Sequence, residues 1–169
     1  SSTPDMPVAD FIKAIDDIPG IAPRSAQVIL AEIGLDMNRF PTHAHLASWA
    51  GLSPGNNESA GKRKSGRTCK GNKTLKTTLI QCAKVAVRKQ HSFYKAQYDR
   101  LVVRRGANRA TVAVAHSILI SIYHMLKFGV PFRDLGCDYY NQFNAEKKIK
   151  HYLNKLKSLG WQSPTPVMA

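Results

Sequence analysis

The sequence predicts an all-α domain, and three observations lead to that prediction. Apolar residues recur every three or four positions over most of the chain, as they do on the inner face of a helix. Glycine, proline and small polar residues interrupt these segments where helices would begin and end. No segment of comparable length alternates apolar and polar residues as a half-buried strand would. With 169 residues, 43% of them hydrophobic, the chain is long enough to build one core.

Three helices are expected before residue 51, and each has a recognisable signal at one end. The Pro19-Gly20 pair ends the first helix, Gly34 ends the second, and Thr42 can cap the N-terminus of the third. The expected ranges are 11–18, 23–33 and 43–50. A polar loop, residues 52–71, follows the third helix.

Four longer helices are expected after this loop. Asn72, Ser92 and Asn108 are suitable N-caps for the first three, and Gly129 and Gly160 stop the last two. The expected ranges are 73–90, 93–105, 109–127 and 139–159. Within this single domain we distinguish a hairpin segment, a basic loop, a helical core and a basic C-terminal helix, at residues 15–35, 52–73, 73–129 and 138–160.

The charge of the chain is strongly positive and unevenly distributed. The formal net charge is +14, made up of −4 in residues 1–61 and +18 in residues 62–169. A field this one-sided favours a polyanionic partner, most often nucleic acid. A solvated basic surface without a ligand remains the alternative from charge alone.

Composition excludes several other classes of protein. The three cysteines form no CxxC pair, which favours a reducing, cytoplasmic location over a disulfide framework. Cysteine, histidine and carboxylate residues are not at metal-ligand spacing, so we expect no metal site in this chain. No run of eighteen apolar residues is present, so no membrane-spanning segment is expected.

The first two expected helices and their connection, "IPGIAPRSAQVILAEIG", resemble a helix-hairpin-helix motif of DNA-binding proteins. Gly20 permits a tight turn, and the N-terminus of the second helix would offer free backbone N–H groups to a phosphate. The second small position is Ala22, where the motif usually has glycine. A hairpin that only packs against the domain is the alternative, and the pattern does not decide between the two.

The loop and the start of the following helix, "NNESAGKRKSGRTCKGNKTLK", have almost no apolar residues and suit phosphate binding. Basic side chains here would neutralise phosphates and release counterions. Asn72 begins the helix, where N–H groups favour an anion. The candidate nucleic-acid contacts are Lys62, Arg63, Lys64, Arg67, Lys70, Asn72 and Lys73, together with Gly20 and Ala22 of the hairpin. A surface loop without a ligand is the alternative.

Several segments in order resemble one family. They are "IPGI", "AQVILAEIG", "AGLSP", then "SAG", "KGN" and, further on, "GVPF". Together they resemble the C-terminal transposase domain of the insertion-sequence family typed as IS one-ten, IS one-sixteen and IS nine-oh-two, which includes bridge-RNA-guided recombinases. The resemblance covers about residues 18–132, and residues 138–169 add no recognisable motif.

The resemblance implies a catalytic serine that attacks a DNA phosphodiester and forms a covalent phosphoserine link. Ser59 matches this serine, because it follows "GLSP" in a Glu-Ser-small segment; the family often has glycine where this chain has Ala60. Ser53 and Ser65 are the nearest rivals. From the residues alone, a serine needs an activating group, and no Ser/His/Asp triad can be assembled here.

The resemblance further implies an N-terminal RNase H-like domain with four metal-binding acids, which we expect to lie outside this chain. Mg²⁺ would then act in the full-length enzyme, and the isolated chain would bind nucleic acid without cutting it. DNA is the implied partner, a homo-oligomer is the implied assembly, and the use of a guide RNA stays open. A non-catalytic DNA- or RNA-binding module and a helical protein-interaction domain are the alternatives.

Overall fold

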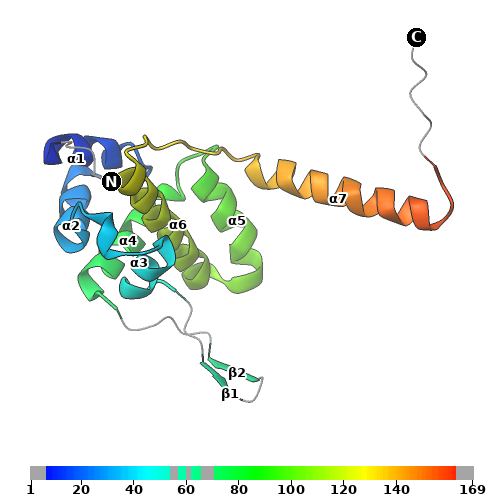
Figure 1. Ribbon diagram of the computed structural model, residues 1–169, viewed down its shortest axis with the longest axis horizontal. Helices are drawn as coiled ribbons and strands as arrows, with labels where there is room; N and C mark the ends of the chain where they lie inside the picture. Colours follow the sequence, from blue (N-terminus) through cyan, green and yellow to red (C-terminus); the bar gives the residue numbers. More distant parts are fainter. Residues whose placement is uncertain (1–6, 54–56, 60–61, 66–70, 163–169) are drawn as a thin grey trace, which may run out of the picture.

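The computed structural model describes residues 7–53, 57–59, 62–65 and 71–162. Of these, residues 57–59, 62–65 and 143 are described by their backbone alone. Helices dominate this part of the chain, as the sequence predicts (Figure 1). The helices are α1 (Val8–Asp16), α2 (Pro23–Ile33), the 3-10 helix η1 (Met37–Arg39), α3 (His43–Trp49), α4 (Lys73–Ala86), α5 (Phe93–Arg105), α6 (Ala107–Phe128) and α7 (Tyr139–Ser158). Between α3 and α4, two short strands, β1 (Asn57–Ser59) and β2 (Lys62–Ser65), pair in an antiparallel hairpin.

Helix α6 is the centre of the fold. It packs against α3, α4 and α5, while α1 and α2 pack on each other and α2 reaches α4. Its inner face is fully buried at Val114, Ile118, Ile122 and Leu126. A buried side chain of this size contributes about 1.5–3 kcal/mol to folding. By length and hydropathy α6 also matches a membrane-spanning helix, yet half of that apolar window is buried by its neighbours, as in a core helix.

Polar contacts fix the α5–α6 pair. The Tyr94 hydroxyl lies 3.0 Å from Ser121 Oγ, and Gln97 Nε2 donates to Ser117 Oγ at 2.9 Å. Burial raises the pKa of Tyr94 to about 12, so this phenol stays neutral throughout the ordinary pH range. The two helices are therefore held in one register by hydrogen bonds as well as by apolar packing.

The expected helix ends are mostly confirmed, with three corrections, the first being that Thr42 precedes α3 without a side-chain capping hydrogen bond. Ser92 and Asn72 cap α5 and α4 through their side chains. Asn108 is not a cap, because Gly106, at φ 80°, turns the chain directly from α5 into α6 and the helix begins at Ala107. Helix α4 ends at Ala86 rather than near residue 90, and the following turn contains His91 at φ 59°.

The turn between α1 and α2 packs closely on α4. Gly20 has φ 87°, and a side chain there would meet the carbonyl oxygen of Cys82 and, at 2.7 Å, the backbone nitrogen of Ala86. The absence of a side chain thus serves two needs, a left-handed backbone and a close backbone approach. The helix-hairpin-helix geometry itself stays a prediction.

The two ends of the β1–β2 loop meet at its base. Asn72 N–H donates to the Trp49 carbonyl at 3.1 Å, and a side chain at Gly71 would clash with the backbone of Gly51 and Trp49. Figure 1 shows the hairpin projecting from the helical body beyond this closed base. The loop therefore leaves the helical body and returns to it at the same place.

The Asn72 side chain ties this base to two helices. Its Oδ1 accepts from Leu75 N–H at 2.9 Å, which caps α4. Its Nδ2 donates to Glu32 Oε2 of α2 at 2.6 Å. One amide thus links the start of α4, the base of the hairpin and α2.

Gly20→Ala is expected to destabilise the protein more than Gly106→Ala. Both glycines have positive φ, so both variants carry backbone strain of about 1–3 kcal/mol. Only Gly20 has backbone within reach of an added Cβ, whereas Gly106 has nothing within 4 Å. The free energies of unfolding from urea titrations should differ by about 1–3 kcal/mol from this clash. Equal losses would contradict the close approach to α4.

Asn72→Ala is expected to cost more than Asn72→Ser, by about 1 kcal/mol, because serine can keep the helix cap. Both variants lose the amide that donates to Glu32. In a double-mutant cycle on unfolding free energies, Asn72→Ser and Glu32→Ala should therefore be less than additive. Fully additive losses would show that the Glu32 contact contributes nothing to the base.

Candidate nucleic-acid interface

Ser59 is the last residue of β1, at the far end of the hairpin from its base. The backbone register sets Ser59 opposite Lys62 and Glu58 opposite Arg63. A register shift between Asn57 and Glu58 leaves Lys64 as the extra residue of a β-bulge. The predicted serine is thus on a strand directly paired with the most basic run of the loop, in a segment that sequence reasoning took for irregular loop.

The remaining predicted contacts of the loop divide into two groups. Arg67 and Lys70 lie outside the described residues. Lys73 is exposed at the first position of α4, next to the hairpin base. Asn72 is beside Lys73, but the Asn72 side-chain amide is already hydrogen-bonded to Leu75 N–H and to the Glu32 carboxylate. A phosphate contact by the Asn72 side chain would have to share or replace these bonds, so its first role is to hold the base.

The hairpin segment of α1 and α2 is a separate location. Ala22 is exposed and precedes α2 as its N-cap, without a side-chain hydrogen bond. Gly20 sits against Cys82 and Ala86, at the end of α4 opposite to Asn72. With 1.5 Å of rise per residue, these two ends of α4 are about 20 Å apart. The structure therefore does not bring Gly20 and Ala22 together with the β1–β2 hairpin.

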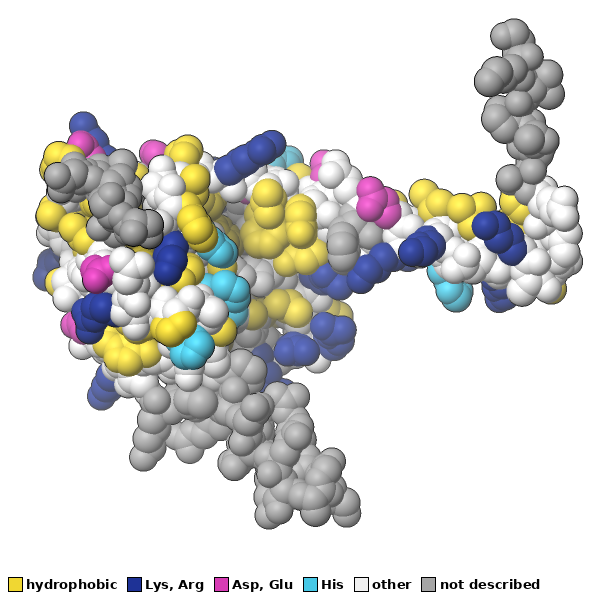
Figure 2. Space-filling view, in the orientation of Figure 1, with side chains coloured by type: hydrophobic (Ala, Val, Ile, Leu, Met, Phe, Trp, Pro, Cys, Tyr) yellow, Lys and Arg dark blue, Asp and Glu magenta, His cyan; other side chains and the backbone are white. Residues whose placement is uncertain are grey.

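Sequence reasoning missed an arginine cluster at the junction of α5 and α6. Arg100, Arg104, Arg105 and Arg109 are all exposed, and they come from the end of one helix and the start of the next. Figure 2 shows Lys and Arg side chains gathered over this end of α5 and along the start of α7. The signal that could have revealed it is the spacing of four between Arg100 and Arg104 within one expected helix, with Arg105 and Arg109 close behind them in the sequence.

The described residues contain no group of three histidine, cysteine or acidic side chains placed to hold a metal ion. The site as described therefore consists of a basic hairpin with a serine, a fixed base and a nearby arginine surface. Such an arrangement can bind phosphates and neutralise charge that develops on them.

Comparison with known proteins identifies the family. The model of the Transposase IS116/IS110/IS902 family matches residues 12–99, from α1 to α5. The insertion element IS110 uncharacterized 43.6 kDa protein of Streptomyces coelicolor is 32% identical over 118 residues, which is 68% of this chain and 28% of that protein. The transposase for insertion sequence element IS1111A of Coxiella burnetii is 32% identical over 116 residues, 66% of this chain and 32% of that protein.

The chain thus spans about a third or less of the length of these curated relatives. The family match includes the β1–β2 hairpin, its base and the whole of α4. The motifs that carry the sequence resemblance lie within this match, except "GVPF" at residues 129–132, and the prediction of the family is confirmed. The chain belongs to the Transposase IS116/IS110/IS902 family.

Proposed function

We propose that this chain is the DNA-binding, serine-bearing part of an insertion-sequence transposase, with Ser59 as the nucleophile. The observation that carries the proposal is the position of Ser59 at the far end of a basic hairpin, opposite Lys62 in the backbone register. The closed base at Trp49 and Asn72 supports it, because a nucleophile must be held in a reproducible position relative to a bound phosphate. Family membership adds a transposase context.

The chemical step transfers a phosphoryl group from DNA to the protein. Ser59 Oγ attacks the phosphorus and loses its proton to a base, so that a serine O–P bond forms. The bond from phosphorus to one deoxyribose oxygen breaks, and that oxygen takes up a proton as a free hydroxyl. The phosphoserine link conserves the energy of the DNA phosphodiester bond. A hydroxyl on the partner DNA end can therefore attack the phosphorus and release Ser59 without ATP.

Basic residues of the hairpin would stabilise the transition state of this step. Negative charge increases on the phosphoryl oxygens as the serine attacks, and nearby cations lower its energy. Lys62 and Arg63 are the candidates closest to Ser59 in the backbone register. Lys64, Arg67, Lys70 and Lys73 would contribute affinity for the flanking phosphates.

Mg²⁺ belongs to the proposal for the full-length enzyme only. The described residues do not form a cluster that would fit it, so no step above is assigned to the metal. In the longer protein, acids of an RNase H-like domain would hold it, and DNA cleavage would require both parts. This chain alone is then expected to bind DNA without cutting it.

Ser59→Ala is expected to abolish covalent attachment while leaving DNA binding close to that of the parent protein. Full-length protein would be incubated with Mg²⁺ and a nicked DNA that cannot religate, and the SDS-resistant adduct would be mapped by mass spectrometry. Ser65→Ala is the matched control, because Ser65 is in the paired strand of the same hairpin. An adduct that survives in Ser59→Ala, or maps to Ser65, would contradict the assignment.

A complete absence of adduct, with salt-sensitive binding intact, would instead support a non-catalytic DNA- or RNA-binding module. The arginine cluster of α5 and α6 is the observation that favours this second candidate, because exposed guanidinium groups suit phosphates and need no serine. Binding to neither DNA nor RNA at any salt concentration would favour a protein-interaction domain.

Arg104→Glu with Arg105→Glu is expected to reduce the salt dependence of DNA affinity. Each lost phosphate contact lowers the slope of log K against log salt by about 0.9 on duplex DNA. The control is Lys150→Glu with Lys157→Glu, an equal charge change on the part of α7 that extends away from the helical body. Equal slopes for the two variants, measured by fluorescence anisotropy, would show that the arginine cluster is not a DNA contact.

A further inference from the structure

Helix α7 carries an apolar stripe that nothing in the described part of the chain covers. Ile149 and Tyr152 are 58% and 60% exposed, and Leu153 and Leu156 are each 40% exposed. Their spacing of three and four residues places them on one face of the helix. Figure 1 shows α7 extending away from the helical body, and among the described elements its contacts are with α5. An exposed stripe of this kind marks an interaction surface.

The start of α7 is fixed in direction by an aromatic cluster. The Tyr140 ring stacks on Phe93 with centroids 5.3 Å apart, and Tyr139 meets the same ring edge-on at 5.3 Å. The Arg100 guanidinium lies 4.7 Å from the centre of the Tyr140 ring. Because these contacts anchor α7 to α5, the rest of the helix points away from α1 and does not reach it within one molecule (Figure 1).

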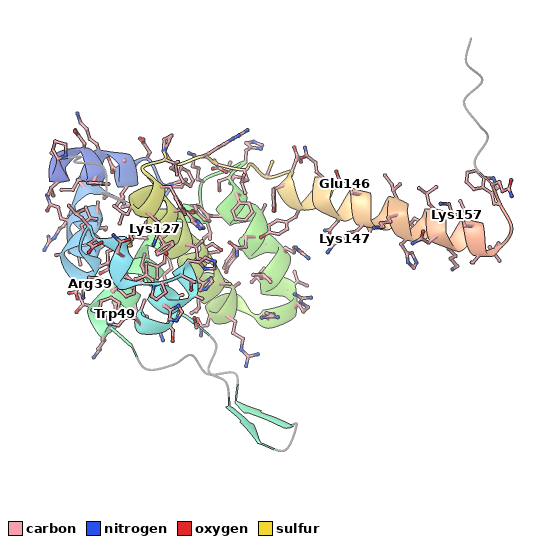
Figure 3. All side chains as sticks on the ribbon, in the orientation of Figure 1. Arg39, Trp49, Lys127, Glu146, Lys147 and Lys157 are labelled. Atoms are coloured by element: carbon pink, nitrogen blue, oxygen red, sulfur yellow. The ribbon has the colours of Figure 1, made fainter. Side chains whose placement is uncertain are left out.

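Lysines border the stripe on both sides. Lys148 and Lys155 lie along one border, seven residues or two helical turns apart, which is about 10 Å. Lys150 and Lys157 have the same spacing along the other border, which also carries Glu146. Figure 3 shows labelled residues of both signs on α7, far from Arg39 and Lys127 on the body. The border with Lys148 and Lys155 is thus purely basic.

The opposite end of the molecule offers a complementary surface. An open apolar pocket of about 200 Å³ lies between α1 and the end of α6. It is lined by Phe11, Ala14, Ile15, Met125, Leu126, Gly129, Val130 and Pro131. Phe128, at 63% exposure, and Val8 extend the apolar surface around it.

Two carboxylates border this pocket along α1. Ala14 lines the pocket, Asp10 lies four residues before it in α1, and Asp17, the C-cap that continues the helical backbone just past α1, lies three after it on the same side. Both acids are exposed, and their separation of seven residues equals that of Lys148 and Lys155. Lys13 is further round the helix, beyond the two acids. The pocket and its border therefore match the stripe and basic border of α7 in polarity, charge and spacing.

We propose that α7 of one copy docks into the α1–α6 pocket of a second copy, with Lys148 and Lys155 facing Asp10 and Asp17. Each copy supplies one arm and one pocket, so two equivalent contacts close a symmetric dimer. Side-by-side pairing of two α7 helices is less favourable, because it would bring two sets of lysines together. This inference does not depend on Ser59 or on DNA binding.

The test uses two charge-reversed variants of the whole chain, Lys148→Glu with Lys155→Glu and Asp10→Lys with Asp17→Lys. In sedimentation velocity, the parent chain should associate reversibly, and each variant alone should associate at least about tenfold more weakly, because attractive pairs become repulsive. An equimolar mixture of the two variants should restore association, since every contact in the mixed dimer again joins opposite charges. Circular dichroism would confirm that both variants keep their helices.

Matched controls sit on the same helices. Lys150→Glu with Lys157→Glu changes α7 by the same charge on its other border, and Asp16→Lys changes α1 away from the pocket. Both should associate like the parent chain.

Three results would overturn the proposal. They are a parent chain that stays monomeric, an Asp10/Asp17 variant that still associates normally, and a mixture that fails to associate. The second result would point to α7–α7 pairing or to another partner for the stripe.

Discussion

The organisation of the site depends on one close backbone contact, where the segment Gly71–Asn72 returns to Trp49 and Gly51. The hydrogen bond from Asn72 N–H to the Trp49 carbonyl and the side-chain-free approach of Gly71 close the loop at its base. Without this closure, α4 would lose its defined start and β1–β2 would leave the body at two separate points. The Asn72 amide then extends the contact to Glu32 of α2. Elements far apart in sequence are thereby joined where the hairpin begins.

A second glycine allows a close backbone approach at the other end of α4. Gly20 lets the α1–α2 turn approach the α4 backbone, so α4 is held by backbone contacts at both ends and by α6 along its length. A rigid α4 therefore gives the backbone of the hairpin a fixed starting point. The arginine cluster at the α5–α6 junction adds positive charge. Its arginines are held in place because α5 packs along α6.

Local signals were sufficient for most of the fold. Short-range features mark several helix ends: the caps at Ser92 and Asn72 and the left-handed glycine at Gly129. The helices that begin or end at these residues were predicted within a few residues of their observed limits. The prediction that Asn108 caps α6 was wrong. Asparagine is a good capping residue, but α6 already begins at Ala107, directly after Gly106 with its positive φ. The strands were missed because polar residues on both faces leave no alternation to read.

The candidate site was predictable only in part. Basic composition and family motifs indicated the loop and Ser59, but no local rule predicts a hydrogen bond between Glu32 and Asn72, forty residues apart. The pairing of Ser59 with Lys62 required the strand register. Likewise, the pocket beside α1 forms only when residues 11–15 meet residues 125–131 in three dimensions.

The proposed function requires the hairpin to present Ser59 to a DNA phosphate from a closed base. The most direct measurement is a structure of the full-length protein trapped on nicked DNA. We expect continuous density from Ser59 Oγ to a phosphorus atom, with the Asn72–Trp49 and Asn72–Glu32 hydrogen bonds intact. A phosphate bound instead at the α1–α2 turn, with Ser59 remote from DNA, would contradict it.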